Sequence, residues 1–83
     1  MRSYNRIGEI RYFTNRRHVD AFGTKNLNDK QKKIVEKYCL DGASAKDIAM
    51  LFYGNKKEAE VRMAKSYLED LTMKSFLVRR QDR

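Results

Sequence analysis

The stretch from residue 44 to residue 71 constrains the fold of this chain more than any other part. It reads S-A-K-D-I-A-M-L-F-Y-G-N-K-K-E-A-E-V-R-M-A-K-S-Y-L-E-D-L, which predicts two helices joined by a short glycine turn. Ser44 is placed to cap the first helix, and Asp47 can complete a capping box. Gly54 can adopt the positive φ that commonly ends a helix. We therefore expect helices over about 45–53 and about 56–73.

Apolar spacing predicts which sides of these helices are buried. The shorter helix has one apolar side, formed by Ile48, Ala49, Leu51 and Phe52. The longer helix has one mostly apolar side, made of Lys57, Val61, Ala64, Leu68 and Leu71. Its opposite side carries Asn55, Ala59, Arg62, Ser66 and Glu69. Two helices joined by a short turn that contains glycine form a helix-turn-helix unit, so we expect this opposite side to be free for a ligand.

Charge narrows the choice of ligand. The chain has 83 residues, of which 36% are charged, and its formal net charge is +8. Its length allows one domain with a modest core. A basic excess of this size favours a polyanion, either nucleic acid or an anionic membrane surface. No apolar run approaches the ~20 residues of a spanning helix and no signal-peptide pattern follows Met1, so we expect no membrane partner.

The scarcity of cysteine and histidine argues against several other classes of protein. Cys39 is the only cysteine and His18 the only histidine, so the chain offers neither an internal disulfide nor a zinc-ligand set. Cys39 lies in a helical pattern, where it predicts a small core residue. No glycine-rich phosphate loop or carboxylate dyad occurs. We expect no enzyme activity, no cofactor, no metal and a reducing cytoplasmic location.

The basic surplus is uneven along the chain. Residues 1–26 carry six Lys/Arg against two acids, residues 27–54 five against four, and residues 55–83 eight against five. We expect residues 1–26 to form a basic, aromatic N-terminal segment and residues 27–83 to form the helical domain. The middle of the chain is then a nearly neutral scaffold.

The N-terminal segment has two possible interpretations. Its Ile, Tyr, Phe and Val content favours strands, and a turn at Asn15-Arg16 would make a β-hairpin. That hairpin would place Tyr12 opposite Val19, and Arg11 opposite Asp20. The alternative is a disordered basic arm that becomes ordered on DNA.

Two further elements complete the prediction. Asn28 can cap a helix that ends near residues 41–42, with Gln31 completing the cap. After the longest helix, residues 76–78 form a short apolar run that is typical of a strand.

Two stretches resemble known helix-turn-helix groups. They are L-N-D-K-Q-K-K-I-V from Leu27 and G-A-S-A-K-D-I-A-M-L-F from Gly42. Both resemble the LuxR-type regulator domain, with its patterns L-T-x-R-E-x-x-V-L and G-x-S-N-K-E-I-A-x-x-L. They also resemble the winged-helix group that includes plasmid replication-relaxation proteins, in which a Leu-x-Phe-Gly-Ser-like segment precedes the recognition helix, as residues 51–55 do here. The resemblance covers about residues 27–78, favours the winged-helix group and implies DNA binding.

The same group has the pattern Leu-x-x-Leu-x-x-x-Gly-Leu-Val at the end of its recognition helix. Residues 68–77 match it with Ser75 in place of the glycine. A wing hairpin would need the N-terminal segment as a partner strand, because little sequence follows. We therefore expect a mainly α fold with a small β element: a three-helix helix-turn-helix core, winged-helix-like, with an N-terminal β-hairpin or arm.

These expectations define a hypothesis about function. The chain is predicted to be a small sequence-specific protein that binds double-stranded DNA, a transcriptional or replication regulator of phage or plasmid type. The residues expected to read bases are Asn55, Ala59, Arg62 and Ser66. Those expected to contact the DNA backbone are Lys56, Lys57, Lys65, Arg79, Arg80, Arg16 and Arg17.

Assembly and partners add two more hypotheses. One short helix-turn-helix reads few base pairs, so a homodimer on paired half-sites is expected. Its interface would be formed by Ile10, Tyr12, Phe13, Val19 and Phe22. The alternative function is a protein-binding module that inhibits or recruits a nucleic-acid-processing machine, with exposed aromatic and Met side chains as contacts. Structured RNA is a third possible ligand.

Overall fold

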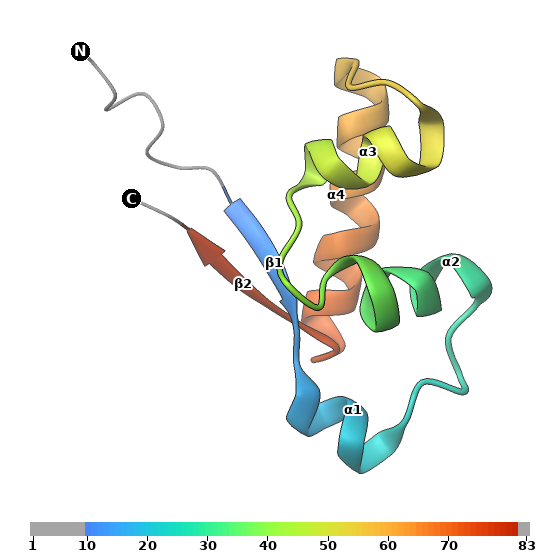
Figure 1. The fold of residues 1–83 in the computed structure, drawn as a ribbon, viewed down its shortest axis with the longest axis vertical. Helices are drawn as coiled ribbons and strands as arrows, with labels where there is room; N and C mark the ends of the chain where they lie inside the picture. The colour runs from blue at the N-terminus through green and yellow to red at the C-terminus, as the bar shows by residue number, and fades with distance from the viewer. Residues whose placement is uncertain (1–9, 82–83) are drawn as a thin grey trace.

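The computed structural model describes residues 10–81. In chain order its elements are β1 (Ile10–Thr14), α1 (Arg16–Phe22), α2 (Asp29–Lys33), the π-helical segment η2 (Ile34–Tyr38), α3 (Ala45–Tyr53), α4 (Glu58–Met73) and β2 (Leu77–Gln81). In Figure 1 the sheet lies to one side of α4 and α2 to the other, α3 crosses in front of the upper part of α4, and α1 projects at the lower end. The prediction of a mainly helical fold with a small β element is confirmed.

The caps of α2 and α3 are those predicted from the sequence. Asn28 and Gln31 form a capping box on α2, and Ser44 and Asp47 form one on α3. Gly54 ends α3 with a φ of 76°, in the left-handed region that glycine occupies without steric cost. The Ser44 and Asp47 side chains therefore fix the start of α3, and the backbone of Gly54 fixes its end.

The core lies between α4, α3, η2 and the sheet. Its largest fully buried side chains are Tyr12, Ile34, Val35, Cys39, Ile48, Leu68 and Leu71. Leu68 and Leu71 come from the side of α4 that the apolar spacing predicted, and Val61 packs against them. Cys39 is a buried core residue, as expected. Burial raises the pKa of its thiol to about 12, so the thiol stays protonated.

The predicted N-terminal hairpin is wrong. Asn15 does not begin a two-residue turn but caps α1, with its side chain accepting from the N–H of His18. Asn-Arg lacks the glycine that a tight hairpin turn favours, and β1 pairs with the distant strand β2 instead. Tyr12 accordingly lies opposite Arg79, and Arg11 opposite Arg80. The alternative of a disordered arm is also wrong for residues 10–22, which form β1 and α1. Residues 1–9 lie outside the described part.

Strand β1 is hydrogen-bonded along both of its edges, to β2 on one side and through an isolated bridge to Ala43 on the other. The N–H of Tyr12 donates to the carbonyl of Ala43 at 2.8 Å, and its carbonyl accepts from the N–H of Ala43 at 3.0 Å. On the other side of β1, β2 runs antiparallel from Leu77 to Gln81. The N-terminal segment therefore supplies the partner strand for β2, and it also joins the sheet to the residues just before α3.

The turn from α4 into β2 has an unusual backbone. Ser75 has a φ of 73°, the only positive φ among the non-glycine residues that the structure describes. This is the position where the winged-helix pattern has glycine. The carbonyl of Ser75 accepts a 2.9 Å hydrogen bond from the Asn15 side chain, which ties the turn to the start of α1.

The helix predicted to end near residues 41–42 is shorter and less regular than expected. After Lys33 the α-helix widens into η2, where the N–H of Cys39 donates to the carbonyl of Ile34 at 2.9 Å. That i to i−5 bond defines a π turn, which buries Ile34 and Val35 together. The predicted start of the longest helix is also displaced by two residues, to Glu58. Within residues 10–81, no helix has the length and apolar character required to cross a bilayer.

Candidate nucleic-acid interface

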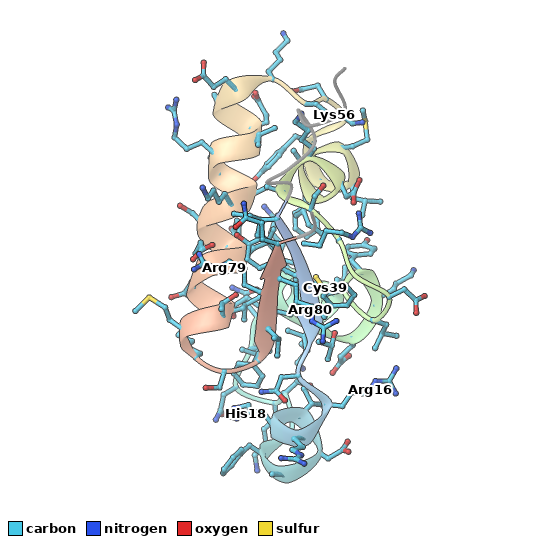
Figure 2. The ribbon with its side chains drawn as sticks, turned by 90° about the vertical axis from the view of Figure 1, so that its left-hand side faces the viewer. Arg16, His18, Cys39, Lys56, Arg79 and Arg80 are labelled. Carbon is cyan, nitrogen blue, oxygen red and sulfur yellow. The ribbon has the colours of Figure 1, made fainter. Side chains whose placement is uncertain are left out.

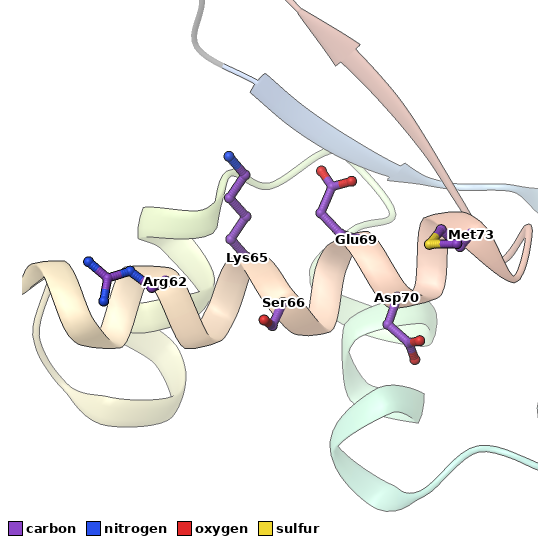
Figure 3. A pocket seen from close by; sticks show the side chains of 6 residues that line it. All are labelled: Arg62, Lys65, Ser66, Glu69, Asp70 and Met73. Carbon is purple, nitrogen blue, oxygen red and sulfur yellow. The ribbon is translucent and has the colours of Figure 1, made fainter.

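The outward side of α4 is the first part of the candidate site. Ala59, Arg62 and Ser66 are all exposed there, while Ala64 on the opposite side is fully buried. Helix α4 packs closely on α3, and this side of α4 remains exposed. A shallow hollow on it is lined by Arg62, Lys65, Ser66, Glu69, Asp70 and Met73 (Figure 3). Three of the four predicted base-reading residues therefore lie on a single accessible helix face.

Asn55, the fourth predicted base reader, is not on the helix. Its side-chain oxygen accepts from the N–H of Lys57 at 2.9 Å, and it lies in the turn that precedes α4. Asparagine readily forms such turns with the backbone two residues ahead. The assignment of Asn55 to the reading helix is therefore wrong, and its side chain supports the turn.

Helix α4 itself is acidic, although the last third of the chain is basic. Between Glu58 and Met73 it has two basic and four acidic residues, giving 2 − 4 = −2. The acids are Glu58, Glu60, Glu69 and Asp70, and the bases are Arg62 and Lys65. Arg62 forms a 3.4 Å ion pair with Glu58, and Asp70 forms a 3.1 Å ion pair with Lys74. Both pairs are exposed, so each contributes little to stability and can be exchanged for another partner.

The C-terminal half of α4 is tied to the sheet through Glu69. The buried Tyr12 hydroxyl donates to its carboxylate, and Arg79 donates to both carboxylate oxygens at 3.1 and 3.0 Å. The hydrogen bond from Tyr12 lowers the pKa of Glu69, with Arg79 contributing to the same effect. Burial raises the pKa of Tyr12, so its hydroxyl remains a donor. Arg79, which was predicted to contact DNA, therefore forms an ion pair with Glu69 within the protein. Glu69 in turn contacts both Arg79 and Tyr12.

The residues predicted to contact the DNA backbone do not form one cluster. Lys56 lies at one end of the long axis and Arg16 at the other, with Arg79 and Arg80 between them (Figure 2). The described chain extends 44 Å along that axis. Lys56 and Lys57 are exposed just before α4 and Lys65 near its middle, whereas Arg16 and Arg17 are exposed on α1. The lysines can act with the α4 face, while the α1 arginines would need a separate part of a long duplex.

The predicted dimer surface is largely used within the protomer. Tyr12 is 1% exposed and belongs to the core, so its assignment to an interface is wrong. Ile10 and Val19 pack against that core. Phe13 lies against Gly42, where an added Cβ would come within 2.5 Å of its ring. Only Phe22, at 70% exposure, retains a large free apolar surface among these five residues.

Sequence reasoning missed two cationic side chains with defined positions. Arg11 lies opposite Arg80 across the sheet, and its guanidinium donates to the carbonyl of Gly42 at 3.0 Å. Lys30 on α2 has its ammonium 5.5 Å from the ring centroids of Phe52, Tyr53 and Tyr67. No local pattern signals either position, because the pairing of β1 with β2 and the docking of α2 on α3 join distant parts of the chain.

Comparison with known proteins does not identify the site. No family model matches the chain, and neither a curated protein nor a solved structure matches it. In the part of the chain that the structure describes, no three His, Cys, Asp or Glu side chains are grouped so that they could hold a metal ion.

Proposed function

We propose that this protein binds double-stranded DNA sequence-specifically, as a small transcriptional or replication regulator of winged-helix-like type in the cytoplasm. One observation carries the proposal. A capped helix, a left-handed Gly54 turn and a longer helix form a packed pair whose outward side presents Ala59, Arg62 and Ser66. A helix with small side chains around an arginine can approach base edges in the major groove, where Arg pairs with guanine.

The distribution of charge on α4 restricts how it can enter the groove. Lys56 and Lys57 precede its first turn, and Arg62 and Lys65 follow within two turns. Arg62 and Lys65 balance the two acids in the first half of α4, Glu58 and Glu60. The second half carries Glu69 and Asp70 and no base, so it would be repelled by phosphates. We therefore place the first half of α4 at the bases and keep its second half outside the groove.

Arg62 must exchange partners for this recognition. Its ion pair with Glu58 has a distance of 3.4 Å, with both side chains largely exposed. A bidentate contact to guanine would replace a weak surface pair by a more specific one. Because Arg62 must leave Glu58 to bind DNA, only sites that offer Arg62 a well-aligned contact should be bound.

Selection from a randomised duplex pool, followed by affinity measurements on the selected site, tests the proposal. We expect the wild type to enrich a defined motif. Arg62→Ala should weaken binding to that motif by about 1–3 kcal/mol and relax the preference at one or two base pairs. Lys57→Ala is the matched control, because loss of a phosphate contact should weaken binding to all sequences alike. A wild type that enriches no motif would contradict sequence-specific recognition.

Exposed methionines on the same helix support a second candidate function. Met73 is 85% exposed and adjoins Glu69 and Asp70 in the hollow on α4 (Figure 3). Methionine is enriched at protein interfaces, and the neighbouring acids would suit a basic partner surface. A protein-binding module that inhibits or recruits a nucleic-acid machine would use this half of the helix. Met73→Ala would then abolish partner binding while leaving DNA binding unchanged.

A further inference from the structure

The two faces of the sheet have different chemistry. Tyr12 and Arg79 both reach Glu69 on α4, so their side chains lie on the inner face. Side chains alternate between faces along a strand, which places Arg11 and Phe13 on the outer face of β1. Their partners in register are Arg80 and Val78, so these two also face outward. Figure 2 shows Arg79 and Arg80 directed to different sides of β2.

The arginines on this outer face stand directly opposite each other. Both backbone groups of Tyr12 bond to Ala43, so in the alternating antiparallel pattern its neighbours Arg11 and Phe13 make the hydrogen-bonded pairs with β2. Opposite residues in such a pair have Cα atoms about 5.5 Å apart. Like charges in that arrangement destabilise a sheet. The repulsion between Arg11 and Arg80 therefore lowers the stability of the sheet.

Each arginine is also held in position. Arg11 donates to the carbonyl of Gly42 at 3.0 Å, which leaves most of its N–H groups unused. The Arg80 guanidinium lies 5.7 Å from the centroid of the Phe13 ring, and that ring rests on Gly42. Stacking on an aromatic ring leaves the N–H edge of Arg available. Within residues 10–81, no carboxylate forms an ion pair with Arg11 or Arg80.

We infer that Arg11 and Arg80 form a clamp for the phosphodiester backbone of DNA. The inference rests on the proposed function and adds a contact on the sheet, outside the α4 face. The two arginines lie on the same face of the sheet, one held at Gly42 and the other over Phe13, and each planar guanidinium group suits the bidentate geometry of phosphate oxygens. Two bound phosphates, one on each guanidinium, would also neutralise the repulsion between the two arginines. The clamp contributes affinity and carries no base sequence.

The test is the salt dependence of binding to a fluorescently labelled duplex, measured by anisotropy for the full chain. Arg11→Gln/Arg80→Gln should reduce the magnitude of the slope of log K against log salt by about 1.8, because each phosphate contact contributes about 0.9. Lys25→Gln/Lys33→Gln is the matched control, since it removes the same charge from exposed lysines outside the sheet. The control should keep the wild-type slope. Arg80→Gln alone, which retains the Arg11 hydrogen bond, should reduce it by about 0.9.

Thermal melts separate a binding role from a structural one. We expect the melting temperature of Arg11→Gln/Arg80→Gln to equal or exceed that of the wild type, because a like-charge pair is removed. Equal slopes for the Arg and Lys double variants, with a wild type that binds duplex, would overturn the clamp and leave the proposed function intact. A wild type that binds no duplex would overturn both. If the double variant unfolds, the slope of Arg80→Gln decides the matter in the same way.

Discussion

The outward side of α4 and the outer face of the sheet are both exposed, but they treat charge in opposite ways. On α4, Arg62 is paired with Glu58, and the helix as a whole is acidic. On the sheet, Arg11 and Arg80 are opposed without an ion-paired carboxylate in the described residues. Paired charges on α4 can be exchanged, which suits discrimination. Under the proposed function, the opposed arginines on the sheet would bind any phosphate and so contribute affinity.

A tyrosine connects the two surfaces. Tyr12 lies in β1, and its hydroxyl donates to Glu69 on α4, which also binds Arg79 of β2. The position of α4 relative to the sheet is therefore fixed by side chains from β1, α4 and β2. We expect changes in this contact to affect both surfaces together.

Gly42→Ala should give the largest effect and should act on the sheet face first. Gly42 has a φ of 96°, and an added Cβ would lie 2.5 Å from the Phe13 ring. The strained backbone alone costs about 1–3 kcal/mol, and displacement of Phe13 removes the support for Arg80. We expect a lower free energy of unfolding by chemical denaturation and weaker DNA binding.

Gly54→Ala is the matched control for this prediction. Gly54 also has a positive φ, 76°, but nothing lies within 4 Å of the position of an added Cβ. Gly54→Ala should therefore lower the free energy of unfolding only by the cost of the strained backbone. Equal losses for the two variants would show that the Phe13 contact with Gly42 contributes nothing, and would remove the basis for a positioned Arg80.

Tyr12→Phe should have a smaller effect, which depends on pH. Loss of one hydrogen bond to a carboxylate should lower the free energy of unfolding by about 1.5 kcal/mol at neutral pH, the low end of the range for charged partners, because Glu69 keeps its contacts with Arg79. The pKa of Glu69 is lowered in the folded state, so its contribution is present above the ordinary pKa of Glu, about 4.3, and is lost as pH falls through the folded-state value.

The difference between wild type and Tyr12→Phe should accordingly shrink in acid. Denaturant unfolding of both proteins across the acidic range measures it. Tyr12 hydroxyl loss does not change the buried ring, so the fold should be retained. A difference that stays constant with pH would contradict the coupling between Tyr12 and Glu69.

Local signals were sufficient to predict α3, α4 and the start of α2, but neither α1 nor the pairing of the sheet. The Ser44–Asp47 and Asn28–Gln31 caps, the Gly54 turn and the Val61–Leu71 spacing all depend on residues a few positions apart, and each is confirmed. Strand β1 was recognised as apolar and β-prone. Its partner lies more than sixty residues later, however, and the hairpin hypothesis paired it with a neighbouring segment.

The candidate site shows the same division. The exposed α4 residues followed from helical periodicity, whereas Arg11 was missed because its position depends on register with Arg80. Asn55 was misplaced by a few residues at the helix boundary, where its own side chain forms the turn. A small hairpin cannot bury Tyr12, so the hairpin hypothesis placed Tyr12 in a dimer interface. In the structure, the contact between the sheet and α4 buries it.

The most direct test of the proposed function is the affinity of the wild-type protein for duplex DNA as salt is raised from dilute to physiological buffer. Phosphate contacts should release counterions and give a linear fall of log K with log salt. The residues expected to make them are Lys56, Lys57, Lys65, Arg11 and Arg80. The slope should be close to −0.9 for each phosphate neutralised. An affinity that does not change with salt, or no measurable binding in dilute buffer, would contradict DNA binding and favour the protein-binding function of the acidic half of α4.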